Sequence, residues 1–125
     1  LSTLHTRSAA QTVERIISAC PIEAQPALVV QLASVLTGVI TQTLVPLDGQ
    51  EGRTAATEIM LNNTAVANLI KEQKTNQIQT VLQSNIQAGM HTMNYSLANL
   101  VKTRKISRDT ALKYSENPTD LSKNI

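Results

Sequence analysis

The chain has 125 residues, of which 42% are hydrophobic and 16% are charged, and its formal net charge is +2. This balance is typical of one folded domain and excludes a disordered chain, a collagen-like repeat and a strongly charged tail. The 11 Lys and Arg residues nearly match the 9 Asp and Glu residues, and Tyr95 and Tyr114 are the only Phe, Trp or Tyr side chains. We therefore expect no nucleic-acid partner, because the chain lacks both a basic stripe for phosphates and aromatic platforms for bases.

The use of cysteine and the length of the apolar runs indicate the compartment. Cys20 is the only cysteine, so no disulfide can form within the chain, which favours the reducing cytoplasm. The longest aliphatic run, residues 27–30, is far shorter than the roughly 18 residues that cross a bilayer, so we expect no transmembrane segment. Because the first residue is Leu1 rather than Met, we expect a fragment or a processed form of a longer protein.

The first third of the chain predicts the end of a strand followed by two helices. Residues 1–6 alternate apolar and β-branched side chains, a pattern typical of a strand. Ser8 is a favourable N-cap for a helix that Pro21 ends, and Pro26 suits the first turn of a second helix that we expect to end at Gly38. The apolar residues of the first helix recur on one face; they are Ala9, Val13, Ile16, Ile17 and Cys20.

The rest of the chain predicts one β-hairpin and then several short helices. Residues 39–45 and 54–60 are rich in β-branched side chains, and the stretch 46–52 between them supplies the Pro, Asp and Gly residues of a turn. Each later helix has a capping residue at its start; these residues are Asn63 or Thr64, Thr75, Thr92 and Ser107. Gly89 is expected to end the second of these helices, and Asn117-Pro118 to end the last, which leaves a loose tail. The pattern predicts a mainly α-helical chain with one β-hairpin.

No self-contained catalytic or metal-binding motif is visible. The four glycines form neither a G-x-x-x-x-G-K-[ST] loop nor a G-x-G-x-x-G loop, so we do not expect this chain alone to bind ATP tightly. His5, Cys20 and His91 lack the short spacings of zinc ligands, so we predict no metal site. Cys20 lies on the apolar face of its helix, where a buried and unreactive thiol is the usual outcome.

His5 is a candidate site residue because of its position. It lies between the expected strand end and the helix start, where α/β proteins often place groups that contact a ligand. A single histidine at such a place is more often a surface or packing residue, so its spacing alone leaves both roles open. We expect His91, which lies in a connection just after Gly89, to be structural or exposed to solvent.

Several strings of the sequence resemble the secretion ATPases. Residues 4–10, Leu-His-Thr-Arg-Ser-Ala-Ala, with Arg15-Ile16-Ile17 after them, are similar to the histidine box of that superfamily. Residues 38–40, 42–44, 52–53 and 58–60 look like the hairpin of the PilT-type pilus retraction ATPases, and residues 65–72, Ala-Val-Ala-Asn-Leu-Ile-Lys-Glu, resemble the AIRNLIRE signature of that family. The likeness continues over residues 89–98 and covers roughly residues 1–112 with its motifs in the right order.

The resemblance implies a fold and a division of the chain. Residues 1–62 would form the C-terminal part of a RecA-like α/β ATPase core, and residues 63–125 a small C-terminal helical subdomain. The phosphate-binding loop, the acidic box and the metal-binding box of the family would lie outside this chain. ATP and Mg²⁺ are therefore implied for the longer protein, and the isolated chain is expected to be inactive.

The resemblance also implies a function. Members of the family form homo-hexamers and hydrolyse ATP to retract type IV pili, which drives twitching motility. They work in the cytoplasm at the bacterial inner membrane, through an inner-membrane platform protein of the pilus machinery. The resemblance therefore implies a motor ATPase whose C-terminal part is this chain.

The resemblance assigns roles to individual residues. His5 would be the catalytic residue that contacts the terminal phosphate of ATP, since an imidazole can donate a hydrogen bond to developing negative charge. Arg15 would support the nucleotide site or a subunit contact. A retraction motif would couple hydrolysis to pilus withdrawal; it comprises Ala65, Val66, Ala67, Asn68, Leu69, Ile70, Lys71 and Glu72.

Three positions depart from the family pattern. Arg7 stands where Asn is usual, Ala67 replaces the first arginine of the signature, and Lys71 replaces the second, so the planar guanidinium fork is absent from both places. These changes allow a divergent paralogue, such as an accessory retraction ATPase. Two other functions stay open from the sequence, namely a stand-alone helical adaptor without ATPase activity and an assembly ATPase of the same superfamily.

Overall fold

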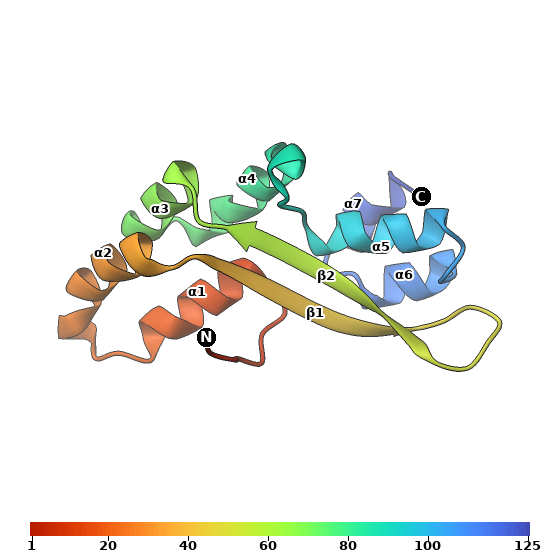
Figure 1. Ribbon diagram of the computed structural model, residues 1–125, viewed down its shortest axis with the longest axis horizontal. Coiled ribbons are helices and arrows are strands. Elements are labelled where there is room, and N and C mark those ends of the chain that lie inside the picture. Colours follow the sequence, from red (N-terminus) through yellow and green to blue (C-terminus); the bar gives the residue numbers. More distant parts are fainter.

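The computed structural model describes all residues, Leu1–Ile125, and shows a mainly helical chain built around one β-hairpin (Figure 1). The elements in chain order are α1 (Ala9–Ser18), the 3-10 turn η1 (Ile22–Ala24), α2 (Gln25–Val35), β1 (Gly38–Pro46), β2 (Arg53–Leu61), α3 (Thr64–Lys71), η2 (Thr75–Gln77), α4 (Ile78–Ser84), η3 (Ile86–Ala88), α5 (Met93–Lys102), α6 (Arg108–Tyr114) and α7 (Pro118–Ser122). The predicted fold class, mainly α with one hairpin, is confirmed.

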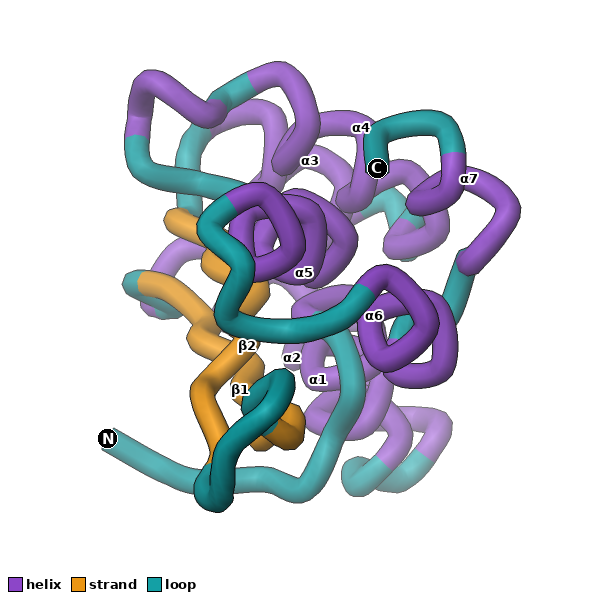
Figure 2. Tube along the Cα trace, turned by 90° about the vertical axis from the view of Figure 1, so that its right-hand side faces the viewer, coloured by secondary structure: helices purple, strands orange, loops and turns teal.

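The hairpin runs along the length of the molecule, and the helices cover only one of its faces. Its strands pair antiparallel from Gly38 opposite Leu61 to Pro46 opposite Arg53. Helices α1–α3 lie at one end of the hairpin and α5–α7 toward its turn, whereas Figure 2 shows the opposite face of the strands without a helix over it. Ile40 on that open face is 72% exposed.

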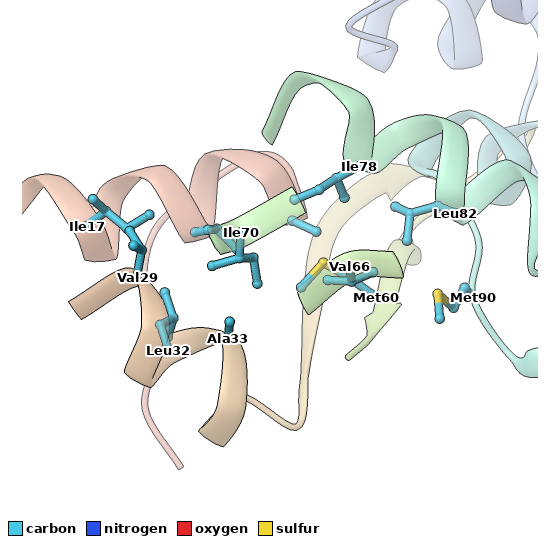
Figure 3. Close-up of a cluster of buried hydrophobic side chains, with 12 residues drawn as sticks. Ile17, Val29, Leu32, Ala33, Met60, Val66, Ile70, Ile78, Leu82 and Met90 are labelled. Atoms are coloured by element: carbon cyan, nitrogen blue, oxygen red, sulfur yellow. The ribbon is translucent and has the colours of Figure 1, made fainter. Parts of the chain in front are cut away.

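Two buried hydrophobic clusters stabilise the fold, and the hairpin contributes to both. The N-terminal cluster, drawn in Figure 3, contains residues of α1, α2, β2, α3 and α4 and one residue beyond them; its members are Ala9, Val13, Ile17, Val29, Leu32, Ala33, Met60, Val66, Ile70, Ile78, Leu82 and Met90. The C-terminal cluster joins the hairpin to α5–α7; its members are Val45, Ala56, Met93, Leu97, Ala98, Ile106, Ala111 and Leu121. A division of the chain into residues 1–62 and 63–125 stays a prediction, and α3 and α4 share their cluster with α1 and α2.

The predicted capping residues explain where four helices begin. Ser8 caps α1, Asn63 rather than Thr64 caps α3, Thr92 caps α5 and Ser107 caps α6, each by accepting an N–H of the first turn. Such a bond satisfies one of the amides that a helix start leaves without a partner. Thr75 differs, because neither η2 nor α4 has a side-chain cap.

Several other expectations from the sequence are wrong, among them Gly89 as the end of the helix after Thr75, because α4 ends at Ser84 and Gly89 ends the 3-10 turn η3. Residues 1–6 form no strand, and Leu1 and Leu4 are exposed, because no neighbouring strand of the chain offers them hydrogen bonds. Gly38 does not end α2 but begins β1, where a Cβ atom would lie 2.9 Å from the carbonyl oxygen of Met60. The tail after Asn117 is not loose, because Asn117 caps α7 and Leu121 is fully buried.

Glu58 lies on the inner face of the hairpin and joins the starts of two helices. Its side chain is 4% exposed, and its two oxygens accept the N–H of Ala9 at 2.8 Å and the N–H of Met93 at 3.1 Å. These are the first residues of α1 and α5, so the buried negative charge faces two helix N-termini, where the helix dipole favours it. Glu58 thereby ties the N-terminal cluster to the C-terminal cluster.

Glu58→Gln is expected to lower the free energy of unfolding by about 1–3 kcal/mol. The amide can accept only through its oxygen, so its NH₂ group would face the second helix N–H and leave that donor without a partner. Urea denaturation followed by circular dichroism measures the change, with Glu51→Gln in the exposed hairpin turn as the matched control. Equal denaturation midpoints for the two variants would show that the carboxylate does not hold the helices.

Candidate functional site

The imidazole of His5 is exposed and makes no hydrogen bond within the chain. Its backbone, in contrast, is fixed, because the Nη1 atom of Arg15 donates to the carbonyl oxygen of His5 at 3.0 Å. The structure thus brings together the two single residues that the resemblance selected, and it places the guanidinium of Arg15 on the backbone that carries His5.

The residues after His5 are also bonded to α1. The hydroxyls of Thr6 and Thr12 share a hydrogen bond of 2.6 Å, and the N–H of Arg7 donates to Oε1 of Gln11 at 2.8 Å. Together with the Ser8 cap, these bonds hold every residue of the His5–Ser8 segment against the first two turns of α1. The segment is irregular in backbone but fixed by side chains, and its single imidazole points to no partner in the chain.

The end of the His5–Ser8 segment borders a polar hollow of about 230 Å³. Arg7, Ser8, Glu58 and Asn94 are among the residues that line it. Since Glu58 holds the N–H of Ala9 on the inner side of this hollow, it fixes the point at which the segment enters α1. No group of three or more His, Cys, Asp or Glu side chains lies close enough to hold a metal ion.

His91 is structural, as expected, rather than part of this site. Its Nε2 atom lies 3.0 Å from the hydroxyl of Thr57, and its ring packs against Tyr95 with the ring centroids 5.5 Å apart. Its backbone pairs with Ile59 in an isolated bridge beside β2. Cys20 is half-buried and not fully buried as predicted, because it follows the last turn of α1 where the cluster ends.

The retraction motif forms α3 and its C-cap, and its residues divide between packing and surface. Val66 and Ile70 are fully buried in the N-terminal cluster, and Ala67 and Leu69 are partly buried against it. The exposed residues of the motif are Ala65, Asn68, Lys71 and Glu72. No hydrogen bond or ion pair joins α3 itself to the His5–Ser8 segment.

Three residues of the site were missed by sequence reasoning. Glu58 occupies a strand position where a carboxylate normally faces solvent, and Gln11 and Thr12 look like polar helix positions. The alternation of side chains along a strand was a signal for Glu58. Ala56 and Met60, two positions before and after it, are apolar and lie on the same face. The Ser8-Ala9-Ala10-Gln11 spacing of a capping box was a signal for Gln11, whereas no local pattern marks Thr12.

Comparisons with known proteins show what this chain is similar to. No protein-family model matches the chain. The chain is 40% identical to a twitching motility protein of Neisseria gonorrhoeae over 120 residues, which is 96% of this chain and 32% of that protein. It is 39% identical to the type IV pilus retraction ATPase PilT of Pseudomonas aeruginosa over 116 residues, which is 93% of this chain and 33% of that protein.

A solved structure gives the same result. The crystal structure of the pilus retraction motor PilT with bound ADP superimposes with a TM-score of 0.84 and 35% identity over 97% of this chain and 33% of that one. This chain is homologous to the PilT-type pilus retraction ATPases. It matches their C-terminal part and spans about a third of their length.

The helices of this PilT homologue are short. No single helix is long and apolar enough to cross a membrane. Residues 9–18 and 22–35 have the necessary length and composition only when taken together, and the two segments are bent by 112° relative to each other.

Gln11→Ala is expected to accelerate hydrogen exchange of the Arg7 amide. The side-chain oxygen of Gln11 accepts that N–H, and loss of a hydrogen bond worth about 1 kcal/mol corresponds to about a five-fold faster opening. Exchange measured by NMR at residues 5–9 tests this, with Gln31→Ala on the exposed side of α2 as the control. An unchanged rate at Arg7 would show that the segment is held without Gln11.

Proposed function

We propose that this chain is the C-terminal part of an ATP-driven motor for type IV pilus retraction, and that His5 senses or contacts the terminal phosphate of ATP. The observation that carries the proposal is the contrast within the His5–Ser8 segment. Side chains of α1 fix its backbone, and the imidazole of His5 is left exposed without a partner. Fixing a donor before the substrate arrives is how a site stabilises charge that develops in a transition state.

Arg15 acts in this proposal as a positioning residue. Its guanidinium donates to the carbonyl of His5, so it sets where the imidazole lies and has further N–H groups to offer. Support for the nucleotide site would thus come through the backbone of His5. A contact of Arg15 with a neighbouring subunit remains compatible with its exposed position.

The remaining parts of the nucleotide site would come from outside this chain. The sequence has no glycine-rich phosphate loop, and its structure has no cluster of metal ligands. ATP and Mg²⁺ would therefore be held by the part of the longer protein that this chain does not span. We propose that this protein works as a homo-hexamer in the cytoplasm, at the inner membrane, against a platform protein of the pilus machinery.

The α3 helix is the proposed output of the motor. Its buried residues fix it to the N-terminal cluster, and its exposed residues offer an amide, a cation and a carboxylate to a partner. In this proposal the exposed side chains of Asn68, Lys71 and Glu72 transmit movement, whereas Val66 and Ile70 keep the helix in place.

His5→Ala in the full-length protein is expected to lower the rate of ATP hydrolysis about a hundredfold or more, as loss of one fixed donor to transition-state charge does. Assembly should not change, because the side chain of His5 makes no contact that holds the fold. Steady-state phosphate release and the mass of the assembly measure the two effects.

The matched control is His91→Ala, which removes the other imidazole of the chain and should leave hydrolysis within about twofold. Equal hydrolysis by His5→Ala and the parent protein would contradict the role of His5. An inactive parent protein, with no phosphate loop encoded upstream, would favour the stand-alone adaptor.

Substitution of the exposed and the buried residues of α3 is expected to have different effects. The double variant Asn68→Ala, Lys71→Ala should hydrolyse ATP normally but lose twitching, since neither side chain packs in the core. Ile70→Ala should instead lower the free energy of unfolding by about 2–5 kcal/mol, because it empties a fully buried position. Motility plates, hydrolysis assays and thermal melts separate these outcomes, and normal twitching by the double variant would contradict an output role for this face.

A further inference from the structure

The hydroxyl of Thr75 makes a contact that local structure does not explain. Thr75 precedes α4 and was expected to cap it, yet its Oγ1 atom donates to Oε1 of Glu14 in α1 at 2.6 Å. Thr75 is 7% exposed, whereas Glu14 is exposed, so the bond lies at the edge of the core. The hydroxyl therefore forms a tertiary hydrogen bond to a carboxylate, a type stronger than a bond between neutral groups.

Thr75 is rigidly connected to the end of α3. The N–H of Gln73 donates to the carbonyl of Ile70, and the N–H of Lys74 donates to the carbonyl of Leu69. These two hydrogen bonds form a Schellman motif. Gln73 takes the left-handed conformation that the motif requires, with a φ of 56°. A displacement of α3 along its axis therefore moves Thr75.

Glu14 is connected in the same way to the His5–Ser8 segment. It lies within α1, whose neighbouring residue Arg15 holds the carbonyl of His5 and whose first residue Ala9 follows the segment directly. A helix of ten residues moves as one body over such a short distance. The Glu14–Thr75 hydrogen bond thus joins a body that carries His5 to a body that includes α3.

The surroundings of this hydrogen bond allow it to form and break without loss of the core. The bonded pair lines a hollow of about 240 Å³ together with Ile17, Ser18, Gln25 and Gln73. No other hydrogen bond or ion pair joins α1 to residues 64–77. The contact of α1 and α3 through the N-terminal cluster is apolar, so this bond is the directional link between α1 and the turn after α3.

We propose that the Glu14–Thr75 hydrogen bond is the link through which a change at the His5–Ser8 segment reaches α3. The proposal rests on the proposed function, in which His5 responds to the nucleotide and α3 acts on a partner. Two rigid bodies joined by one directional bond can change relative position in a defined way, and a coupling of this kind between two sites is typically worth a factor of about 5 or more.

The test compares Thr75→Val with Thr75→Ser in the full-length protein. Valine keeps the shape of threonine without the donor, and serine keeps the donor. Thr75→Val is expected to hydrolyse ATP within about twofold of the parent and to retract pili at least about five-fold more slowly, and Thr75→Ser should match the parent in both. Thr80→Val, which removes an exposed hydroxyl from the next helix, is the matched control.

Variants of the acceptor keep the test decisive if Thr75→Val unfolds. Glu14→Ala removes the acceptor and should reproduce the loss of retraction, whereas Glu14→Gln keeps an amide oxygen and should retain most of it. Glu14→Ala combined with Thr75→Val should cost no more retraction than either alone, since both remove the same bond.

Two results would overturn the link. Normal retraction by Thr75→Val and Glu14→Ala would show that the bond does not transmit movement. An equal fall of hydrolysis and retraction in both, with lower melting temperatures, would show that it only stabilises the fold. The hydrolysis rate of His5→Ala tests the proposed function separately. That variant keeps the Glu14–Thr75 hydrogen bond, so the two failures can be told apart.

Discussion

The buried carboxylate of Glu58 is the interaction on which the arrangement of the two clusters depends. A charge in the interior normally needs an opposite charge nearby, but no cation pairs with Glu58. The starts of α1 and α5 take that role, each with a free N–H and the positive end of its dipole. Because β2 carries the carboxylate, the hairpin sets the position of both helices at once. The apolar effect has no direction of its own, so these two hydrogen bonds add a directional constraint on both helices.

The helix α1 combines three kinds of contact along its length, and each has a different consequence. Its apolar face buries Val13 and Ile17 in the N-terminal cluster, which fixes the helix to the core. Its polar residues hold the His5–Ser8 segment, so the helix and the segment form one body. Glu14 reaches the turn after α3 on a third side. A change in the position of the segment is thereby a change in the position of the whole helix.

Much of the fold could be predicted because its signals are local. The signals for the caps at Ser8 and Thr92 and for the apolar face of α1 lie within a few residues of each other. The two strands are likewise joined by a short turn. The errors concern features that depend on distant partners. A strand needs a neighbouring strand to bond with. The C-terminal tail is ordered because Leu121 is buried in a hydrophobic cluster, and the hydroxyl of Thr75 bonds to Glu14 in another helix. The resemblance to a motif selected His5, whereas the bonds that hold its backbone to α1 depend on the folded chain.

The packing of α3 indicates what the departures from the family signature mean. Ala67 is partly buried against the N-terminal cluster, so a small side chain fits the position, and an arginine there would have to extend along the surface to keep its charge in water. Lys71 is exposed in the last turn, where a cation is favourable at the helix C-terminus and remains accessible to a partner. The loss of the first arginine therefore falls at a packing position, and the change at the second keeps a positive charge on the exposed face. An output surface that relies on charge survives these changes, whereas one that needs the bidentate geometry of arginine does not.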